Sequence, residues 1–391
     1  MQSKIKLSVP HIDKNDIDYI NKVLKSEWIS TSSKTVNMFE DKLATFCKTK
    51  YSVALNSGTS AIHLGLKILG VDNTSEVIVP SLTFIATVNP ILYLGAKPII
   101  FDVDQYHNLK IGDVINFIKK KTKFENNKTI NKKTKKVIKV IIIAHMWGRA
   151  CNFSELKTIC QKRNIFILED AAEALGSYVK KDKYKHCGSV GDIGCLSFNA
   201  NKIITTGSGG AIITNNKNFY QRAQYLANQA KDDTFNYIHN ECGYNYKMNG
   251  ICAALGISQL KKLKKKIIRR RNIYNRYLLN FKNSKNIKIL SYDVKSKTNY
   301  WMNVIFFKML NFKQIHNLSL SLFKKKIETR RVWRPLNLQL HLKKFQTHNI
   351  VNATKLYQSS LCVPSDDDIS NSDIDKISNY IKKFHEIINN N

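Results

Sequence analysis

The stretch VIKVIIIAHMWG, residues 137–148, decides the fold class of this chain. It begins as a nearly continuous apolar run, which is typical of a strand buried on both faces of a parallel sheet. Further short apolar runs occupy residues 75–81, 97–104, 165–170 and 194–198. Segments with apolar residues at helical spacing, such as 59–70, lie between these runs. This alternation predicts an α/β fold with a mostly parallel central sheet covered by helices.

The length of 391 residues is too great for one ordinary core and predicts two domains. A long helical pattern covers residues 253–279, and beyond it strand and helix patterns alternate anew. We expect an N-terminal arm and a large domain in residues 1–266, and a smaller α+β domain in residues 267–391. The Lys-rich segment 119–139 is expected to form an exposed loop or a short hairpin.

The composition narrows the class of protein. Lys and Arg number 63 against 29 Asp and Glu, which gives a formal charge of +34, and no apolar stretch reaches the length of a membrane span. Lysine tracts of this kind usually form solvated helix faces, and no nucleic-acid-binding motif is present, so nucleic acid is not expected as the primary partner. The positive field would instead attract an anionic small molecule. We expect a cytoplasmic protein.

The eight cysteines are scattered, without Cys-x-x-Cys pairs or zinc-ligand spacing. Several of them lie in apolar runs. Reduced thiols packed in the core are therefore expected, with no metal site and no disulfide framework.

Two polar motifs follow strands at the sheet edge where α/β proteins bind ligands. NSGTSA, residues 56–61, is a strand-to-helix turn whose amides and hydroxyls suit a phosphate, although many ordinary helix caps look the same. Asp170 comes directly after the apolar run 165–168, which places its carboxylate at that edge. The alternative role for Asp170 is a helix N-cap.

SFNANKIITTGSGG, residues 197–210, holds one lysine among apolar residues and glycines. Lys202 lies just past the strand 194–198, and a partly desolvated amine is a better nucleophile than one on the surface. The glycines from Gly207 to Gly210 let the backbone pass closely beneath a planar ligand. Phe84 offers an aromatic face for stacking, although core packing explains it equally well.

Together these features match the requirements of one cofactor. Pyridoxal 5′-phosphate (PLP) needs a phosphate cradle, a carboxylate beside its pyridine nitrogen, a lysine that bonds to its aldehyde and an aromatic ring to stack on. The sequence therefore predicts a PLP enzyme in which Lys202 bonds to the cofactor and Asp170 keeps the ring nitrogen protonated.

Longer motifs resemble those of the DegT/DnrJ/EryC1/StrS family of sugar-nucleotide aminotransferases. These are ALNSGTSAIHLGLKILG, VIVPSLTFIATVNPILYLGAKPIIFDVD, AHMWGRACN, LEDAAEALGS, GDIGCLSFNANKIITTGSGGAIIT and GYNYKMNGICAALGISQL. The resemblance covers nearly the whole chain and implies the fold of the type I PLP-dependent aminotransferases.

The resemblance also assigns roles to individual residues. Lys202 matches the lysine that bonds to the cofactor, and Asp170 matches the partner of the pyridine nitrogen. The other implied cofactor-binding residues are Gly58, Thr59, Ser60, Phe84, Glu173, Ser197 and Asn245. Asn245 matches a residue that reaches the cofactor phosphate from a second subunit, which implies a homodimer with shared active sites.

Candidates for substrate contact are His145, His239, Tyr244, Lys247 and Arg330. Either histidine could equally be structural. Lys247 stands where relatives carry arginine, which keeps the charge but loses the two-pronged hydrogen bonding of a guanidinium. Glu173 stands where many relatives carry His or Gln, so the resemblance leaves its role beside the cofactor open. Arg331 stands in place of a proline.

The resemblance implies that the amino group of L-glutamate is transferred to a nucleotide-linked keto sugar in two half-reactions. Several segments, ETRRVW among them, look most like enzymes that aminate the 4-keto carbon of a UDP-linked 6-deoxyhexose for cell-surface glycans. The alternatives are a 3-keto-sugar aminotransferase, a dehydratase on the same fold, or a basic binding protein without catalytic activity. Dehydration is disfavoured because some dehydratase relatives carry histidine where this chain has Lys202.

Overall fold

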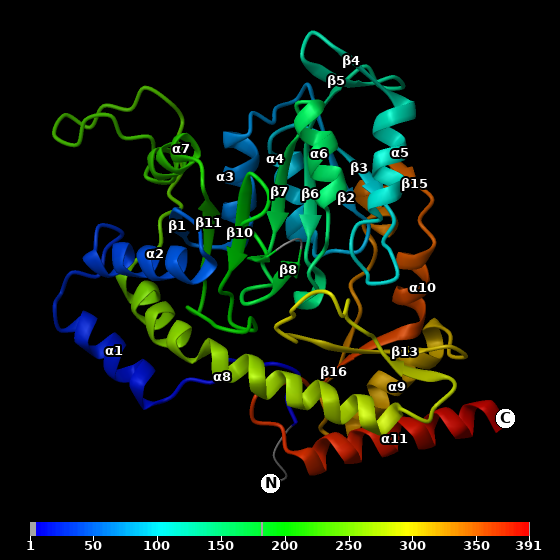
Figure 1. The fold of residues 1–391 in the computed structure, drawn as a ribbon. Helices are drawn as coiled ribbons and strands as arrows, with labels where there is room; N and C mark the ends of the chain where they lie inside the picture. Colours follow the sequence, from blue (N-terminus) through cyan, green and yellow to red (C-terminus); the bar gives the residue numbers. More distant parts are fainter. Residues whose placement is uncertain (1–4, 181–182, 391) are drawn as a thin grey trace.

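A computed structural model of the chain describes residues 5–180 and 183–390. Its centre is a ten-stranded sheet in the order β1-β11-β10-β7-β6-β2-β3-β15, to which the β4–β5 hairpin adds through β6 (Figure 1). The strands are β1 (Tyr51–Leu55), β11 (Gly210–Thr214), β10 (Ile193–Ser197), β7 (Phe166–Asp170), β6 (Val137–Ala144), β2 (Ser75–Pro80), β3 (Lys97–Phe101), β15 (Gln346–His348), β4 (Thr122–Glu125) and β5 (Lys128–Asn131). From β10 to β15 neighbouring strands are parallel, whereas β11 is antiparallel to both β10 and β1. The predicted α/β fold with a mostly parallel sheet is confirmed.

Helices cover both faces of this sheet, which explains the continuous apolar run in β6. Val140 and Ile142 belong to a core shared with α3 (Gly58–Ile68), α4 (Asn89–Tyr93) and α7 (Lys217–Ala227). Ile141 and Ile143 point the other way, into a core shared with α5 (Ile111–Lys121) and α6 (Ser154–Lys162). Successive side chains of a strand face opposite sides, so burial on both sides requires apolar residues at every position.

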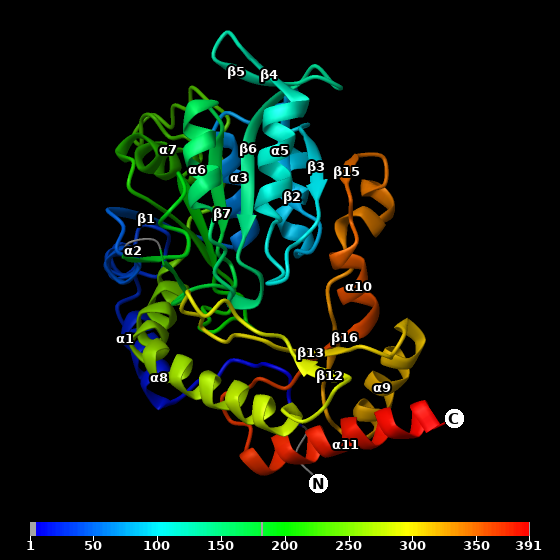
Figure 2. The ribbon, with the colours of Figure 1, turned by 45° about the vertical axis from the view of Figure 1, so that its right-hand side comes forward.

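The Lys-rich segment 119–139 forms a hairpin. It contains the end of α5, then β4 and β5, which pair with Thr122 opposite Asn131. In Figures 1 and 2 this hairpin projects from one end of the sheet. Helix α6 begins at Ser154, and no side chain makes a capping hydrogen bond at its start.

A second, four-stranded sheet lies below the first, in the order β12-β13-β16-β14. Its strands are β12 (Ile287–Ile289), β13 (Asn303–Phe307), β16 (Ser360–Val363) and β14 (Arg330–Arg331), and its helices are α9 (Phe312–Lys324), α10 (Asn352–Ser359) and α11 (Asn371–Asn390). The remaining elements are α1 (Lys14–Leu24), α2 (Lys34–Cys47), the short hairpin β8 (Tyr178–Lys180) and β9 (Tyr184–His186), and the single turns η1 (Ile85–Thr87), η2 (Met146–Gly148), η3 (Leu336–Leu338) and η4 (Leu340–Leu342). This sheet, α9, α11 and the end of α8 share their own core.

Helix α8 (Gly250–Phe281) connects the two parts and runs beneath the large sheet toward the second sheet (Figure 1). Asn249 caps its start by accepting a hydrogen bond from the amide of Cys252. The expected division at residue 267 falls inside this helix, and β15 returns to pair with β3 of the large sheet. Strand β15 thus belongs to the second interval of sequence but pairs within the large sheet. The division into residues 1–266 and 267–391 stays a prediction.

A buried ion pair ties α8 to the segment before α11. Asp367 Oδ1 lies 2.7 Å from Arg270 Nε, and Asp367 Oδ2 lies 2.8 Å from Lys266 Nζ. The Arg270 side chain is 1% exposed, and its guanidinium also donates to the carbonyl of Trp301 at 2.7 Å. Burial alone would raise the pKa of Asp367, but the Arg270 and Lys266 charges outweigh it and hold that pKa below its usual range.

Asp367→Asn is expected to lower the free energy of unfolding by roughly 3 kcal/mol at neutral pH, because Arg270 is left buried without its anion. The pKa of Asp367 is low in the folded chain, so its contribution is present above the ordinary value of 3.8 and is lost as the pH falls. Urea unfolding at a series of pH values should therefore show the two proteins converging below about pH 4. Asp375→Asn, which removes a partly exposed partner of Arg276, serves as control and should cost no more than about 1 kcal/mol.

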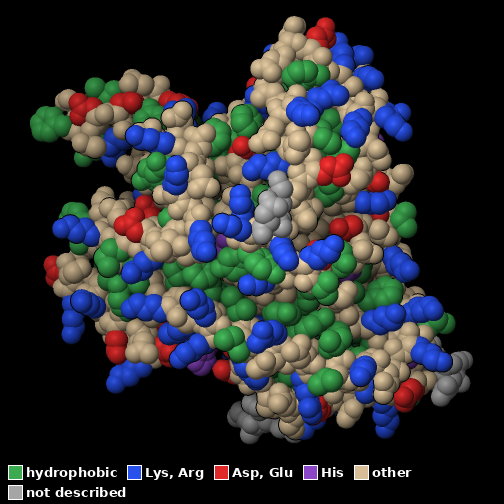
Figure 3. Space-filling view, viewed as in Figure 1, with side chains coloured by type: hydrophobic (Ala, Val, Ile, Leu, Met, Phe, Trp, Pro, Cys, Tyr) green, Lys and Arg blue, Asp and Glu red, His purple; other side chains and the backbone are tan. Residues whose placement is uncertain are grey.

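The surface carries the excess of basic residues. In Figure 3 lysine and arginine side chains are scattered over the visible face, with acidic side chains between them. Within the described residues, no helix is long and apolar enough to cross a membrane. All eight cysteines are free thiols, and burial raises the pKa of Cys160 to about 12.

Candidate active site

A cavity of about 470 Å³ opens where three parallel strands end. The strand register places Ala144 of β6 beside Asp170 of β7, and Asp170 beside Cys195 of β10. The cavity is lined by Ser57, Gly58, Thr59, Ile62, Thr83, Phe84, Ala86, Ala144, His145, Met146, Asp170, Ala172, Glu173, Ser197, Asn199, Asn201, Lys202, Ser208, Gly209, Trp301, Arg330 and Trp333. Parts of the chain that are far apart in sequence thus meet at the carboxyl edge of the sheet, where α/β proteins bind ligands.

Asp170 forms the floor of this cavity as the last residue of β7. Its Oδ2 accepts a hydrogen bond from Thr87 Oγ1 at 2.6 Å, and its Oδ1 accepts one from the amide of Ala172 at 3.1 Å. The two bonds fix the plane of the carboxylate. Asp170 does not cap a longer helix, since a turn follows it directly.

The N-terminus of α3 supplies backbone amides to the same cavity. Ser57 caps the helix: its side chain accepts from the amide of Ser60, and its carbonyl accepts from Ala61. The amides of Gly58 and Thr59 make no hydrogen bond to the described residues. Two free amides at a helix N-terminus favour an anion such as a phosphate.

Glycine at position 58 permits the close approach of α3 to β10. A Cβ atom there would lie 2.8 Å from Ser197 Cβ, and one at Gly210 would lie 2.3 Å from the carbonyl oxygen of Ser57. Neither neighbour is the flexible end of a side chain, so a substitution must displace the helix start. The glycines therefore allow the turn around α3 and the end of β10 to form one cradle.

Gly58→Ala is expected to weaken binding of the cofactor by about 10-fold or more, because overpacking costs about 1–3 kcal/mol and is relieved by moving the free amides. Titration of the cofactor-free protein with PLP, followed by absorbance, measures this affinity. Gly112→Ala is the matched control, because a Cβ at that position meets no atom within 4 Å. An unchanged affinity in Gly58→Ala would contradict the cradle.

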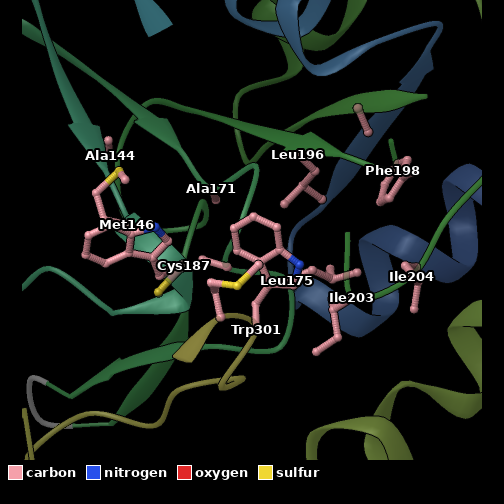
Figure 4. Close-up of a cluster of buried hydrophobic side chains, with 14 of the residues drawn as sticks. Ala144, Met146, Ala171, Leu175, Cys187, Leu196, Phe198, Ile203, Ile204 and Trp301 are labelled. Carbon is pink, nitrogen blue, oxygen red and sulfur yellow. The ribbon is translucent and has the colours of Figure 1, made fainter. Parts of the chain in front are cut away.

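Lys202 reaches the cavity from the segment after β10. Its Nζ lies 3.3 Å from Glu173 Oε1 and 4.4 Å from the centre of the Trp301 ring, and its side chain is 13% exposed. The neighbouring Ile203 and Ile204 are buried in a hydrophobic cluster, together with Trp301, and this cluster anchors the segment (Figure 4). The chain therefore holds this lysine on an aromatic face, with a carboxylate beside it.

Phe84, Arg330 and Trp333 also line the cavity. Phe84 is 52% exposed, so its ring is available to a ligand and is not packed in the core. Arg330 is exposed on β14, and Trp333 follows it in the second sheet's region. The region of the second sheet thus contributes a cation and an aromatic ring to a cavity at the edge of the large sheet.

Several residues expected at the site lie outside the cavity. Ser60 is buried, and its hydroxyl donates to Asn56 Oδ1 at 2.6 Å. Lys247 Nζ contacts Glu40 Oε1 at 3.2 Å and Gln224 Oε1 at 2.7 Å, Tyr244 stacks on Tyr246, and His239 contacts the carbonyl of Gln229. Asn245 is exposed, and its carbonyl accepts from Asn56.

His145 lines the cavity, but both of its ring nitrogens are engaged within the protein. Nδ1 accepts from the amide of Cys151 at 3.0 Å, so the proton lies on Nε2, which donates to Glu169 Oε2 at 2.8 Å. Glu169 is buried and also accepts three backbone amides. These contacts favour the structural role that the sequence left open. Arg331 is likewise engaged, with its guanidinium over the Phe312 ring.

Trp301, Trp333 and Thr87 are among the residues at the site that were not predicted from the sequence. Trp301 and Trp333 lie in segments expected as strand and loop of the smaller domain, far in sequence from Lys202. Tryptophan is rare in this chain, with four in total, and that rarity is the signal that could have selected them. Thr87 is a polar residue inside the apolar stretch 84–92, which is a comparable signal.

The donor set of the cavity fits PLP. Two free amides of α3 and the Ser197 hydroxyl offer donors for its phosphate, Asp170 offers a carboxylate for its ring nitrogen, and Lys202 offers an amine for its aldehyde. The fold and this cavity together define a PLP-dependent aminotransferase of the type I fold.

Comparison with known proteins agrees. The DegT/DnrJ/EryC1/StrS aminotransferase family matches residues 10–382, and the chain belongs to this family. It is 35% identical to a GDP-perosamine synthase of Escherichia coli O157:H7, over 96% of this chain and 97% of that one. It is 34% identical to a UDP-4-amino-4,6-dideoxy-N-acetyl-β-L-altrosamine transaminase of Campylobacter jejuni, over 76% and 75% of the two chains. A putative sugar aminotransferase of Streptococcus pneumoniae in its PLP form shares the fold, with a TM-score of 0.88, 24% identity and coverage of 99% and 100%. The protein is a PLP-dependent sugar aminotransferase.

Proposed function

We propose that the protein transfers the amino group of L-glutamate to the 4-keto carbon of a nucleotide-linked 6-deoxy-4-ketohexose, with UDP as the expected nucleotide. One observation carries the proposal: Lys202, Asp170 and the free amides of α3 line one cavity. The product would be an amino sugar for a cell-surface glycan.

PLP, when bound, would supply a carbonyl that bonds to amines and a ring that accepts electrons. Gly58, Thr59 and Ser197 would hold its phosphate at the start of α3. Phe84 would stack on its ring.

Asp170 would hold a proton on the pyridine nitrogen, and Thr87 and Ala172 fix the carboxylate for that task. Lys202 Nζ would take the proton from the amino-bearing carbon of glutamate in the first half-reaction. In the second it would deliver a proton to C4 of the sugar. One amine thus serves both substrates.

Arg330 and Trp333 support binding of the nucleotide sugar in the cavity. The Arg330 guanidinium would pair with the diphosphate, and the Trp333 ring offers a flat apolar surface to a sugar. Both come from the region of the second sheet, so specificity and cofactor chemistry would reside on different parts of the chain.

We also propose a homodimer with shared active sites, in the cytoplasm. Support comes from Asn245 and His239, which are exposed and lie outside the cavity of their own chain. Mixing two inactive or impaired variants tests this: Lys202→Ala and Asn245→Ala homodimers, dissociated and reassociated together, should regain activity in one of the two sites of each mixed dimer. No recovery would argue against shared sites.

GDP is the second candidate for the nucleotide, favoured by the full-length likeness to a protein named GDP-perosamine synthase. A panel of UDP-, GDP- and dTDP-linked 4-keto and 3-keto 6-deoxyhexoses, incubated with the enzyme and L-glutamate, separates the candidates. We expect an aminated product, identified by mass and NMR, from a UDP-linked 4-keto sugar. If only the GDP-linked sugar is aminated, GDP replaces UDP as the proposed nucleotide. If the amino group is found at C3, C3 replaces C4 as the proposed position of amination. No amination of any member of the panel would contradict the proposal.

A further inference from the structure

Among the described residues, the ionisable group within hydrogen-bond distance of Lys202 is the carboxylate of Glu173. Lys202 Nζ lies 3.3 Å from Glu173 Oε1, and the two side chains are 13% and 8% exposed. The Trp301 ring covers another side of the ammonium at 4.4 Å. Because little water reaches this pair, the carboxylate and not solvent balances the lysine charge.

The carboxylate is fixed in its orientation by a backbone amide. The amide of Trp147 donates to Glu173 Oε2 at 2.7 Å, so Oε1 is directed at Lys202. Trp147 adopts φ +53°, which is uncommon for a residue with a side chain. Its ring is held between Trp333 at 5.4 Å and the Arg149 guanidinium at 5.3 Å. Packing thus maintains a strained backbone that aims one amide at Glu173.

The ionisable groups facing Glu173 come from several elements. Asp170 lies at the end of β7, Lys202 follows β10, Arg149 follows η2 and Cys362 lies in β16. Burial raises the pKa of Glu173 above its usual range, and the Lys202 charge only partly opposes this rise. The protein environment therefore tolerates both the carboxylate and the carboxylic acid at this position.

We propose that Glu173 is the positioning and proton-holding partner of Lys202, an inference that rests on the proposed transamination. In the resting pair Lys202 is an ammonium beside the carboxylate, and when Lys202 is to act as a base, Nζ passes one proton to Glu173 Oε1. An ammonium–carboxylate pair becomes an amine–carboxylic acid pair, and the net charge stays zero. The amine then accepts the proton from substrate carbon and becomes an ammonium, while Glu173 stays protonated. After Nζ has delivered that proton to C4 of the sugar, the reverse transfer from Glu173 restores the ammonium–carboxylate pair. A glutamate at position 173 can therefore take a proton from Lys202 and return it.

Glu173→Gln tests the pair, because it keeps the shape and an acceptor for Trp147 but cannot take a proton. The full-length protein is acylated with acetic anhydride over a range of pH, and modification of each lysine is followed by peptide mass spectrometry. One arm uses protein without cofactor, and the other uses PLP-loaded protein after excess L-glutamate. Lys202 should react about 10-fold faster in Glu173→Gln near neutral pH, since a charge-assisted hydrogen bond has been lost. The difference should vanish at alkaline pH, where the amine is deprotonated in both proteins.

Glu40→Gln is the matched control, because Glu40 Oε1 lies 3.2 Å from Lys247 Nζ and the two side chains are 8% and 10% exposed. Glu40→Gln should accelerate the acylation of Lys247 and leave the acylation rate of Lys202 unchanged. Should Glu173→Gln fail to fold, Glu173→Asp is the substitute, because it moves the carboxylate away from Lys202 by one methylene. The acylation of Lys202 should be faster in this variant as well.

Rates for Lys202 that agree within about twofold at every pH in wild type and in a folded Glu173 variant would overturn the inference. The cofactor-free arm needs neither glutamate nor sugar. A normal amination of keto sugars together with unchanged Lys202 rates would therefore reject the Glu173 pairing alone. A changed Lys202 rate without amination of any keto sugar would reject the proposed function and leave the pairing supported.

Discussion

Lys202→Ala is expected to lower turnover by more than about 10⁴-fold, because one amine is asked both to bond to the cofactor and to move the substrate proton. The cofactor should still bind, since the amides of α3, Ser197 and Asp170 are untouched. Steady-state rates with glutamate and the accepted keto sugar measure the first effect. Equilibrium dialysis with PLP measures the second.

A lysine of comparable setting provides the control for that substitution. Lys262 on α8 is 22% exposed and ion-paired to Asp13 and Asp16, but it does not line the cavity. Lys262→Ala should change stability and leave the rate near that of wild type. Turnover retained in Lys202→Ala would refute the role of the lysine.

Asp170→Asn is expected to reduce turnover by about 10²- to 10⁴-fold through loss of the proton on the pyridine nitrogen. Asparagine preserves size and can still accept the Thr87 hydroxyl, but a neutral amide cannot stabilise a positively charged ring. The loss should fall on both half-reactions alike, which stopped-flow absorbance with glutamate and with the keto sugar can show separately.

Asp192→Asn separates this effect from the mere removal of a partly buried acid that accepts a backbone amide. Asp192 accepts the amide of Ile167 at 2.7 Å, at the opposite end of β7 from Asp170. The control should lose stability without a matching loss of rate. Near-normal rates in Asp170→Asn would contradict the assignment of this carboxylate.

The parts of the fold that the sequence predicted are those governed by local pattern. Continuous apolar strands flanked by amphipathic helices indicated the parallel sheet, and the polar residues after those strands indicated the edge where Asp170, Lys202 and α3 meet. These residues could be predicted because the carboxyl ends of parallel strands all lie at the same edge of the sheet.

The parts that were missed depend on contacts distant in sequence. Trp301 reaches Lys202 because Arg270 and the loop before β13 hold it there, and no local pattern reports that packing. His145 lies at the expected edge, yet the amide of Cys151 and the carboxylate of Glu169 occupy its ring. Strand β15 joined the large sheet through pairing with β3, across almost 250 residues of chain. For Asn245, the predicted role requires a second subunit.

Reduction of the PLP-loaded protein with borohydride, followed by peptide mass spectrometry, identifies the lysine that bonds to the cofactor. One stable cofactor adduct per chain is expected, located on residue 202. An unmodified residue 202, or an adduct on a different lysine, would contradict this expectation.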